Sequence, residues 1–79
     1  MLTVTIRTDA ENTNTFEVQG IERIHNPVYD EDGTLAMETG VFLRYEGGGG
    51  THYGDKTCKG YRFYVMNRYG KTIANYFFN

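Results

Sequence analysis

The sequence predicts an all-β or β-rich α+β fold: a single small domain over residues 1–79, with about five or six antiparallel strands in a bent sheet or small barrel. Apolar residues recur mostly at every second position, which is typical of strands with one buried face. β-Branched and aromatic residues, which favour strands, are frequent in the same segments. A chain of 79 residues has room for one modest core, since so small a domain buries only roughly 60% of the surface that its unfolded chain exposes.

The alternation is clearest near the N-terminus, where Leu2, Val4 and Ile6 are separated by polar residues. Further segments with strand-forming residues are expected to form the remaining strands. They are residues 16–18, 28–29, 35–37, 41–45, 61–66 and 73–78.

The spacing of apolar residues slips by one between Val18 and Ile24, because Ile21 and Ile24 stand three positions apart. A β-bulge at Gly20 would explain the slip, and so would a short helical turn over residues 21–24. The bulge is favoured, since the Asn-Pro pair that follows would stop a helix within two turns.

The connections between strands carry turn signals. In Asp30-Glu31-Asp32-Gly33 the acidic residues suit the first turn positions, and the glycine supplies the positive φ of a type I turn with a G1 bulge. Asn67-Arg68-Tyr69-Gly70 predicts the turn between the last two strands. The polar run 9–14 predicts a loop. Residues 47–60, which begin with four glycines, predict a loop of about fourteen residues. A structureless loop of this length in a small domain is usually either functional or disordered.

Charge is distributed unevenly along the chain. Residues 56–79 hold five cations and no acid, a local charge of +5, whereas residues 1–55 hold ten acids and three arginines, a local charge of −7. The formal net charge of −2 therefore conceals a polarity that bears on the choice of partner rather than on the fold.

The aromatic and basic final hairpin is the candidate binding face. Because strand residues alternate between faces and Arg62 favours solvent, Arg62, Tyr64 and Met66 are expected to face outward. The acidic tip of the first hairpin is a second candidate. The candidate binding residues are Tyr61, Arg62, Tyr64, Arg68, Tyr69 and Lys71, with Asp30, Glu31 and Asp32 at the acidic tip.

Two functions fit this pattern. Tyrosines beside cations are typical of protein interfaces, and this favours a non-enzymatic protein-binding module with a protein partner. The same rings could stack bases between phosphate contacts, so a nucleic-acid-binding module is the alternative, although the acidic remainder of the chain argues against it. The aromatic rings could also simply fill the core of a domain without tryptophan.

Motifs that carry catalysis or metal binding are poorly matched. Residues 49–57 depart from a phosphate-binding loop by Asp55, whose carboxylate would repel phosphate, and no helix follows them. A zinc site could be assembled from His52, Asp55, Cys58 and His25. These residues lack the closely spaced pairs of Cys or His that structural zinc sites usually show. Cys58 stands between two lysines that could lower the pKa of its thiol, but it lacks an identifiable catalytic base. We expect no enzymatic activity, no metal and no cofactor.

The chain lacks an apolar run of roughly 20 residues and a secretory leader pattern, so we expect no membrane association and a cytoplasmic location. The single cysteine fits a reducing compartment. Oligomerisation is one way for so small a domain to gain buried area, and a homodimer is one candidate assembly.

Two segments carry a resemblance. Met1-Leu2-Thr3-Val4-Thr5-Ile6-Arg7-Thr8-Asp9 resembles the start of short uncharacterised proteins encoded by phages and prophages, and Asn67-Arg68-Tyr69-Gly70-Lys71-Thr72-Ile73-Ala74 is similar to the final hairpin in many of them. The resemblance implies a mobile-element origin. It also implies a role such as that of the phage inhibitors of host defence, which include the anti-CRISPR proteins, acting in the cytoplasm of a bacterial host. It transfers no role to any single residue.

Overall fold

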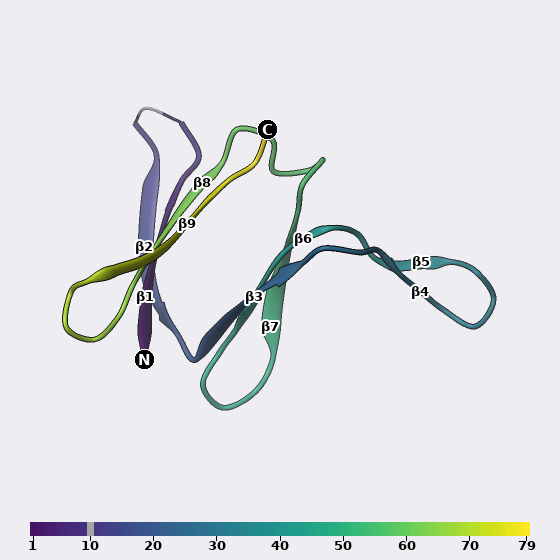
Figure 1. Ribbon diagram of the computed structural model, residues 1–79, viewed down its shortest axis with the longest axis horizontal. Helices are drawn as coiled ribbons and strands as arrows, with labels where there is room; N and C mark the ends of the chain where they lie inside the picture. Colours follow the sequence, from purple (N-terminus) through teal and green to yellow (C-terminus); the bar gives the residue numbers. More distant parts are fainter. Residues whose placement is uncertain (10) are drawn as a thin grey trace.

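The computed structural model describes residues 1–9 and 11–79, and in these residues it contains nine β-strands and no helix (Figure 1). The strands are β1 (Leu2–Arg7), β2 (Thr13–Val18), β3 (Gly20–Ile24), β4 (Val28–Tyr29), β5 (Leu35–Met37), β6 (Gly40–Arg44), β7 (Gly50–Gly54), β8 (Arg62–Met66) and β9 (Thr72–Phe77). The predicted all-β class is confirmed. No helix in the described residues is long and apolar enough to cross a membrane.

The strands form three antiparallel sheets. The main sheet has the order β2-β1-β8-β9, the second sheet has the order β3-β6-β7, and the arm is the two-stranded ribbon β4-β5. Among the described residues, the edge strands of the main and second sheets pair with no further strand, so neither sheet closes into the small barrel that the sequence also allowed. The strands outnumber the expected five or six because all seven segments named above form strands, and β3 and β7 add two more.

The core lies between the main and second sheets. The largest fully buried side chain is Phe63 of β8, whose ring stacks on Phe78 and meets Tyr53 of β7 edge-on, with both centroid distances 5.0 Å. Because Tyr53 belongs to the second sheet and Phe63 to the main sheet, these rings join the two layers. The buried apolar residues are Val4, Ile6, Val18, Val41, Leu43, Cys58, Phe63, Val65 and Phe78.

The slip in spacing after Val18 marks the point where the chain changes sheets. β2 pairs with β1 up to Val18, and β3 pairs with β6 from Gly20 onward in unbroken register. Between them the backbone N–H of Gln19 donates to the carbonyl of Arg44, 2.7 Å away. Neither the bulge at Gly20 nor the helical turn is present. The apolar spacing slips because β3 belongs to a different sheet from β2, so the residues of β3 that face the core need not continue the alternation of β2.

The long loop expected over residues 47–60 is the clearest correction. β7 occupies Gly50–Gly54 and pairs with β6 in regular register. The turn before it is made by Gly47, Gly48 and Gly49, whose φ angles are all positive. Glycine is also required at Gly50, where a Cβ would meet the backbone carbonyl of Leu43 and the ring of Phe42. The glycine run is therefore a turn leading into a strand, and glycine continues at position 50 because the neighbouring strand leaves no room for a Cβ.

The two predicted turns are confirmed. At the first, Gly33 has a φ of 83° and the N–H of Asp30 donates to the carbonyl of Thr34 at 2.8 Å. At the second, Gly70 has a φ of 80° and the side-chain oxygen of Asn67 accepts from two backbone N–H groups, those of residues 69 and 71. The predicted loop 9–14 shortens to the connection between β1 and β2, with residue 10 outside the described residues and residues 13–14 inside β2.

Candidate functional site

The outer face of the main sheet presents the candidate site. On β8, Phe63 and Val65 point into the core and are fully buried, so the alternate residues Arg62, Tyr64 and Met66 face away from it. This is the orientation that the sequence predicts. The second sheet packs on the opposite, inner face through the shared core, and the arm extends away from the main sheet (Figure 1).

Two arginines stand side by side on this face. Arg7 of β1 lies directly opposite Arg62 of β8 in the antiparallel register. Arg62 in turn lies opposite Phe77 of β9, and its guanidinium carbon is 4.2 Å from the centre of the Phe77 ring. Both arginines are exposed, and neither forms an ion pair within residues 1–9 and 11–79.

A second row of the outer face lies beside the arginines. Tyr64 of β8 lies opposite Thr5 of β1, and the hydroxyl of Thr5 is 3.1 Å from that of Thr15 on β2. Tyr64 is half-buried, so its ring borders the arginine row without belonging to the core. The outer face therefore combines cations, the rings of Tyr64 and Phe77, and small hydroxyls, a composition typical of recognition surfaces.

These side chains border an open recess of about 340 Å³, lined by Arg7, Asp9, Gly60, Arg62 and Tyr64. The Asp9 carboxylate accepts hydrogen bonds from the backbone N–H groups of Glu11 and residue 12, each at 2.8 Å, and from the Asn12 side chain. These bonds hold the pKa of Asp9 below its usual range, so the carboxylate stays ionised. Arg7 donates instead to the Asp9 backbone carbonyl, 3.3 Å away. The Asp9 carboxylate thus stabilises its own loop.

Like charges directly opposite each other on neighbouring strands destabilise a sheet. Arg7 and Arg62 are such a pair, and among the described residues no carboxylate lies within ion-pair distance of either, although the charge of Arg7 contributes to lowering the pKa of Asp9. An anionic group in the recess would relieve the repulsion. Guanidinium groups are suited to this, since their forked donors bind carboxylate or phosphate in bidentate geometry. The site can therefore bind an anion that an aromatic ring also contacts.

The other predicted binding residues lie in three different places. Tyr61 is half-buried and packs against the core. Arg68, Tyr69 and Lys71 surround the β8–β9 turn, at the end of β8 away from the recess, where the guanidinium of Arg68 lies over the Tyr69 ring and donates to its hydroxyl at 2.7 Å. The acidic residues 30–32 form the tip of the arm. Of the predicted set, only Arg62 and Tyr64 line the recess.

Sequence reasoning missed Arg7, Asp9, Gly60 and Phe77. Arg7 ends the alternating strand that the sequence predicts most clearly, so its outward direction could have been read from that pattern. Its position beside Arg62 could not, because β1 and β8 are far apart in the chain and only the tertiary pairing joins them.

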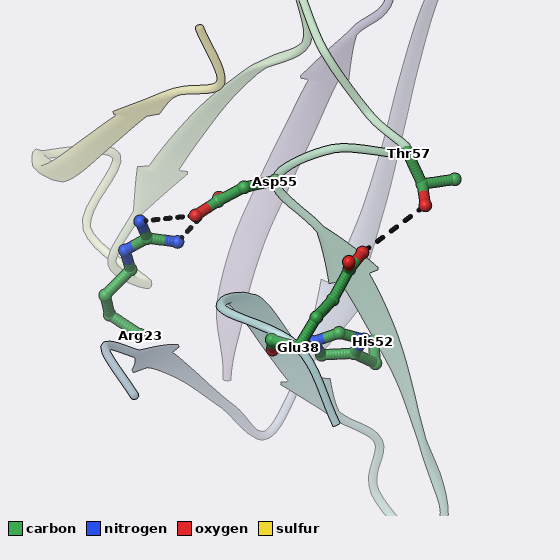
Figure 2. A network of polar contacts seen from close by, with 5 residues as sticks. All are labelled: Arg23, Glu38, His52, Asp55 and Thr57. Atoms are coloured by element: carbon green, nitrogen blue, oxygen red, sulfur yellow. Dashed lines mark hydrogen bonds and ion pairs between the residues drawn. The ribbon is translucent and has the colours of Figure 1, made fainter. Parts of the chain in front are cut away.

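A polar network at one end of the second sheet contains residues weighed above for catalysis or metal binding (Figure 2). Arg23 of β3 donates to both oxygens of Asp55, at 2.9 and 3.0 Å. The Nε2–H of His52 donates to the carbonyl of Glu38 at 2.9 Å, and the hydroxyl of Thr57 donates to the Glu38 carboxylate at 3.3 Å. These contacts connect β7 and the segment after it to β3 and to Glu38, which lies between β5 and β6.

The electrostatics of this network agree with a structural role. The hydrogen bonds from Arg23 hold the pKa of Asp55 below its usual range. Burial raises the pKa of the Cys58 thiol, and the nearby Glu38 charge acts in the same direction. The two lysines beside Cys58 therefore do not activate it as the sequence allowed. In the described part of the chain, no group of three or more His, Cys, Asp and Glu residues is placed to hold a metal ion.

No protein-family model, no curated protein and no solved structure matches this chain. The functional argument therefore depends on the geometry of the outer face.

Proposed function

We propose that this protein is a non-enzymatic protein-binding module that recognises an acidic segment of a partner protein through the outer face of its main sheet. The observation that supports the proposal is the Arg7–Arg62 pair beside Tyr64, which is exposed and forms no ion pair in the described residues. A carboxylate of the partner would lie between the guanidinium groups, and Tyr64 would supply rigid apolar contact area.

The charge of the whole chain favours a protein over a nucleic acid. The formal net charge is −2, and the acidic tip of the arm adds repulsion for a long polyanion that follows the surface. Two arginines can bind one or two carboxylates at a local site without the continuous basic track that a nucleic acid requires.

Single-stranded nucleic acid is the second candidate function. Its support is the presence of two rings, Tyr64 and Phe77, on the same sheet face as two cations, since bases stack on such rings while arginines contact phosphates. It predicts binding to oligonucleotides that falls steeply with salt.

The proposal is tested by affinity capture from nuclease-treated bacterial lysate, using the immobilised wild-type protein and two charge-reversal variants. Arg62→Glu alters the site, whereas Lys56→Glu makes the same charge change at an exposed residue outside the recess. We expect a protein that the wild type and Lys56→Glu retain and that Arg62→Glu loses. Circular dichroism should show all three chains folded.

Equal retention by Arg62→Glu and Lys56→Glu would rule out the outer face as the binding surface. Fluorescence anisotropy with a labelled single-stranded oligonucleotide separates the two candidates. Binding that weakens steeply with salt and is lost in Arg62→Glu would replace the protein partner with a nucleic acid.

The resemblance to phage-encoded proteins extends the proposal to a biological role. The protein would inhibit a bacterial defence or host protein in the cytoplasm by occupying its acidic surface. Co-expression with the captured protein, followed by an assay of that protein's activity, tests this extension.

A further inference from the structure

The arm is the part of the molecule that contributes no residue to the core. It is a two-stranded ribbon that projects from the second sheet (Figure 1). Val28 and Leu35 are each 50% exposed and Tyr29 is 60% exposed, although all three are large apolar or aromatic residues. An isolated two-stranded hairpin is only marginally stable in water. The exposed sides of the arm are therefore suited to packing against another surface.

The β8–β9 turn offers a surface of matching chemistry. We call it the basic turn and define it as Arg68, Tyr69, Lys71 and Ile73. Tyr69 is 77% exposed and Ile73 is 51% exposed, so apolar area lies beside two cations. The tip of the arm carries Asp30, Glu31 and Asp32 next to its own apolar residues. Both surfaces thus have exposed apolar area, and the arm carries negative charge where the basic turn carries positive charge.

The two surfaces cannot meet within one molecule. The molecule extends 43 Å along its longest axis, and the arm and the basic turn lie at opposite ends of that axis (Figure 1). In two copies lying antiparallel, however, each arm would reach the basic turn of the other. Such a twofold arrangement makes both contacts at once, which is the self-complementary geometry typical of homodimers.

We propose that the protein forms a homodimer in which the arm of each copy packs on the basic turn of the other. Val28, Tyr29 and Leu35 supply apolar contact area against Tyr69 and Ile73. The acidic tip pairs with Arg68 and Lys71, and this charge complementarity sets the antiparallel orientation. The outer-face recess is not part of this contact, so the dimer does not depend on the function proposed above.

A charge-swap experiment tests the contact by sedimentation velocity over a concentration series. The first variant carries Asp30→Lys and Glu31→Lys, and leaves Asp32 in place because its carboxylate accepts from the N–H of Thr34 within the turn. The second carries Arg68→Glu and Lys71→Glu. We expect the wild type to dimerise and each variant alone to dimerise at least about tenfold more weakly. An equimolar mixture should restore the dimer, because each reversed surface then meets a complementary one.

Matched controls change the same charges elsewhere. Glu11→Lys with Glu46→Lys makes the same change in charge as the first variant. Lys56→Glu with Lys59→Glu makes the same change in charge as the second. All four residues are exposed and lie outside both surfaces. Both controls should dimerise like the wild type. If a charge-reversed variant fails to fold by circular dichroism, neutral substitutions at the same residues, Asp30→Asn with Glu31→Gln or Arg68→Gln with Lys71→Gln, replace it.

Three results would overturn the proposal. They are a wild-type protein that stays monomeric at every concentration, a dimer that survives both charge reversals, and a mixture that stays monomeric although each variant has lost the dimer. Arg62→Glu separates this proposal from the function proposed above, since it should abolish partner capture and leave the dimer intact.

Discussion

Arg23 and Asp55 form an ion pair across the second sheet. Arg23 lies on β3 and Asp55 directly follows β7, so the pair links the segments on either side of the central strand β6. Both side chains are partly shielded from water, with 32% and 29% of their surface exposed. The bidentate geometry and partial shielding should make this pair worth more than a typical surface ion pair.

We predict that Asp55→Asn destabilises the protein by about 1–2 kcal/mol at neutral pH. The pKa of Asp55 is lowered in the folded state, so its contribution is fully present above the unfolded-state pKa of about 3.9 and is lost as the pH falls through the folded-state pKa. Urea unfolding at neutral and acidic pH measures the difference, with Glu46→Gln at an exposed residue outside the ion pair, the recess and the dimer contact as control. A difference that persists unchanged in strong acid would contradict the proposed cause.

At the scale of the element, simple alternation gives β8 one face in the core and one face toward the recess. Phe63 is fully buried and contacts two other rings, whereas its neighbour Tyr64 faces outward beside the recess. Because successive strand residues point to opposite faces, one strand can contribute both to the core and to a binding surface.

Phe63→Ala should therefore mainly reduce stability, whereas Tyr64→Ala should mainly reduce binding. Phe63→Ala removes core packing and should cost about 3–5 kcal/mol, while Tyr64→Ala should cost about 1 kcal/mol or less. Once a partner has been captured, Tyr64→Ala should weaken its binding at least about tenfold, the loss typical of an interface anchor. Chemical denaturation and a binding titration measure the two effects. If Tyr64→Ala unfolds the domain, the outer ring belongs to the core and the binding face lies elsewhere.

At the scale of the whole molecule, two sheets share one core and the arm lies outside it. Val41 and Leu43 of the second sheet are buried in the same cluster as Val4 and Val65 of the main sheet. The chain also passes directly from one sheet to the other at Gln19. The two sheets are therefore expected to unfold together.

Leu43→Ala should destabilise both sheets by about 2–5 kcal/mol, because the cavity would lie in their shared core. Native-state hydrogen exchange should show reduced protection in β1 and β8 as well as in β6. In dilute wild-type protein the amides of the arm should exchange faster than those of either sheet. The amides of β7 should be protected, and those of residues 47–49 should exchange fast. Unchanged protection in the main sheet of Leu43→Ala would mean that the sheets fold independently.

Local signals in the sequence determined the β class, both predicted turns and the outward face of β8. Each depends on neighbouring residues: the period of two, or a glycine where the backbone needs a positive φ. Local reasoning was wrong at residues 47–60, where a glycine run was read as a long loop. The glycine at position 50 is required by the backbone carbonyl of Leu43 and the ring of Phe42 on the neighbouring strand, and such contacts are not visible in the local sequence.

The tertiary structure decided which strands meet. The recess exists because β1 pairs with β8, which brings Arg7 beside Arg62. The arrangement of the arm and the basic turn at opposite ends of the molecule has the same origin. Strand pairing over long sequence separations is set by how the whole core packs, whereas backbone preference is set by near neighbours. The sequence alone therefore predicted most of the strands and a set of candidate binding residues, and only the fold showed which of those candidates share a surface.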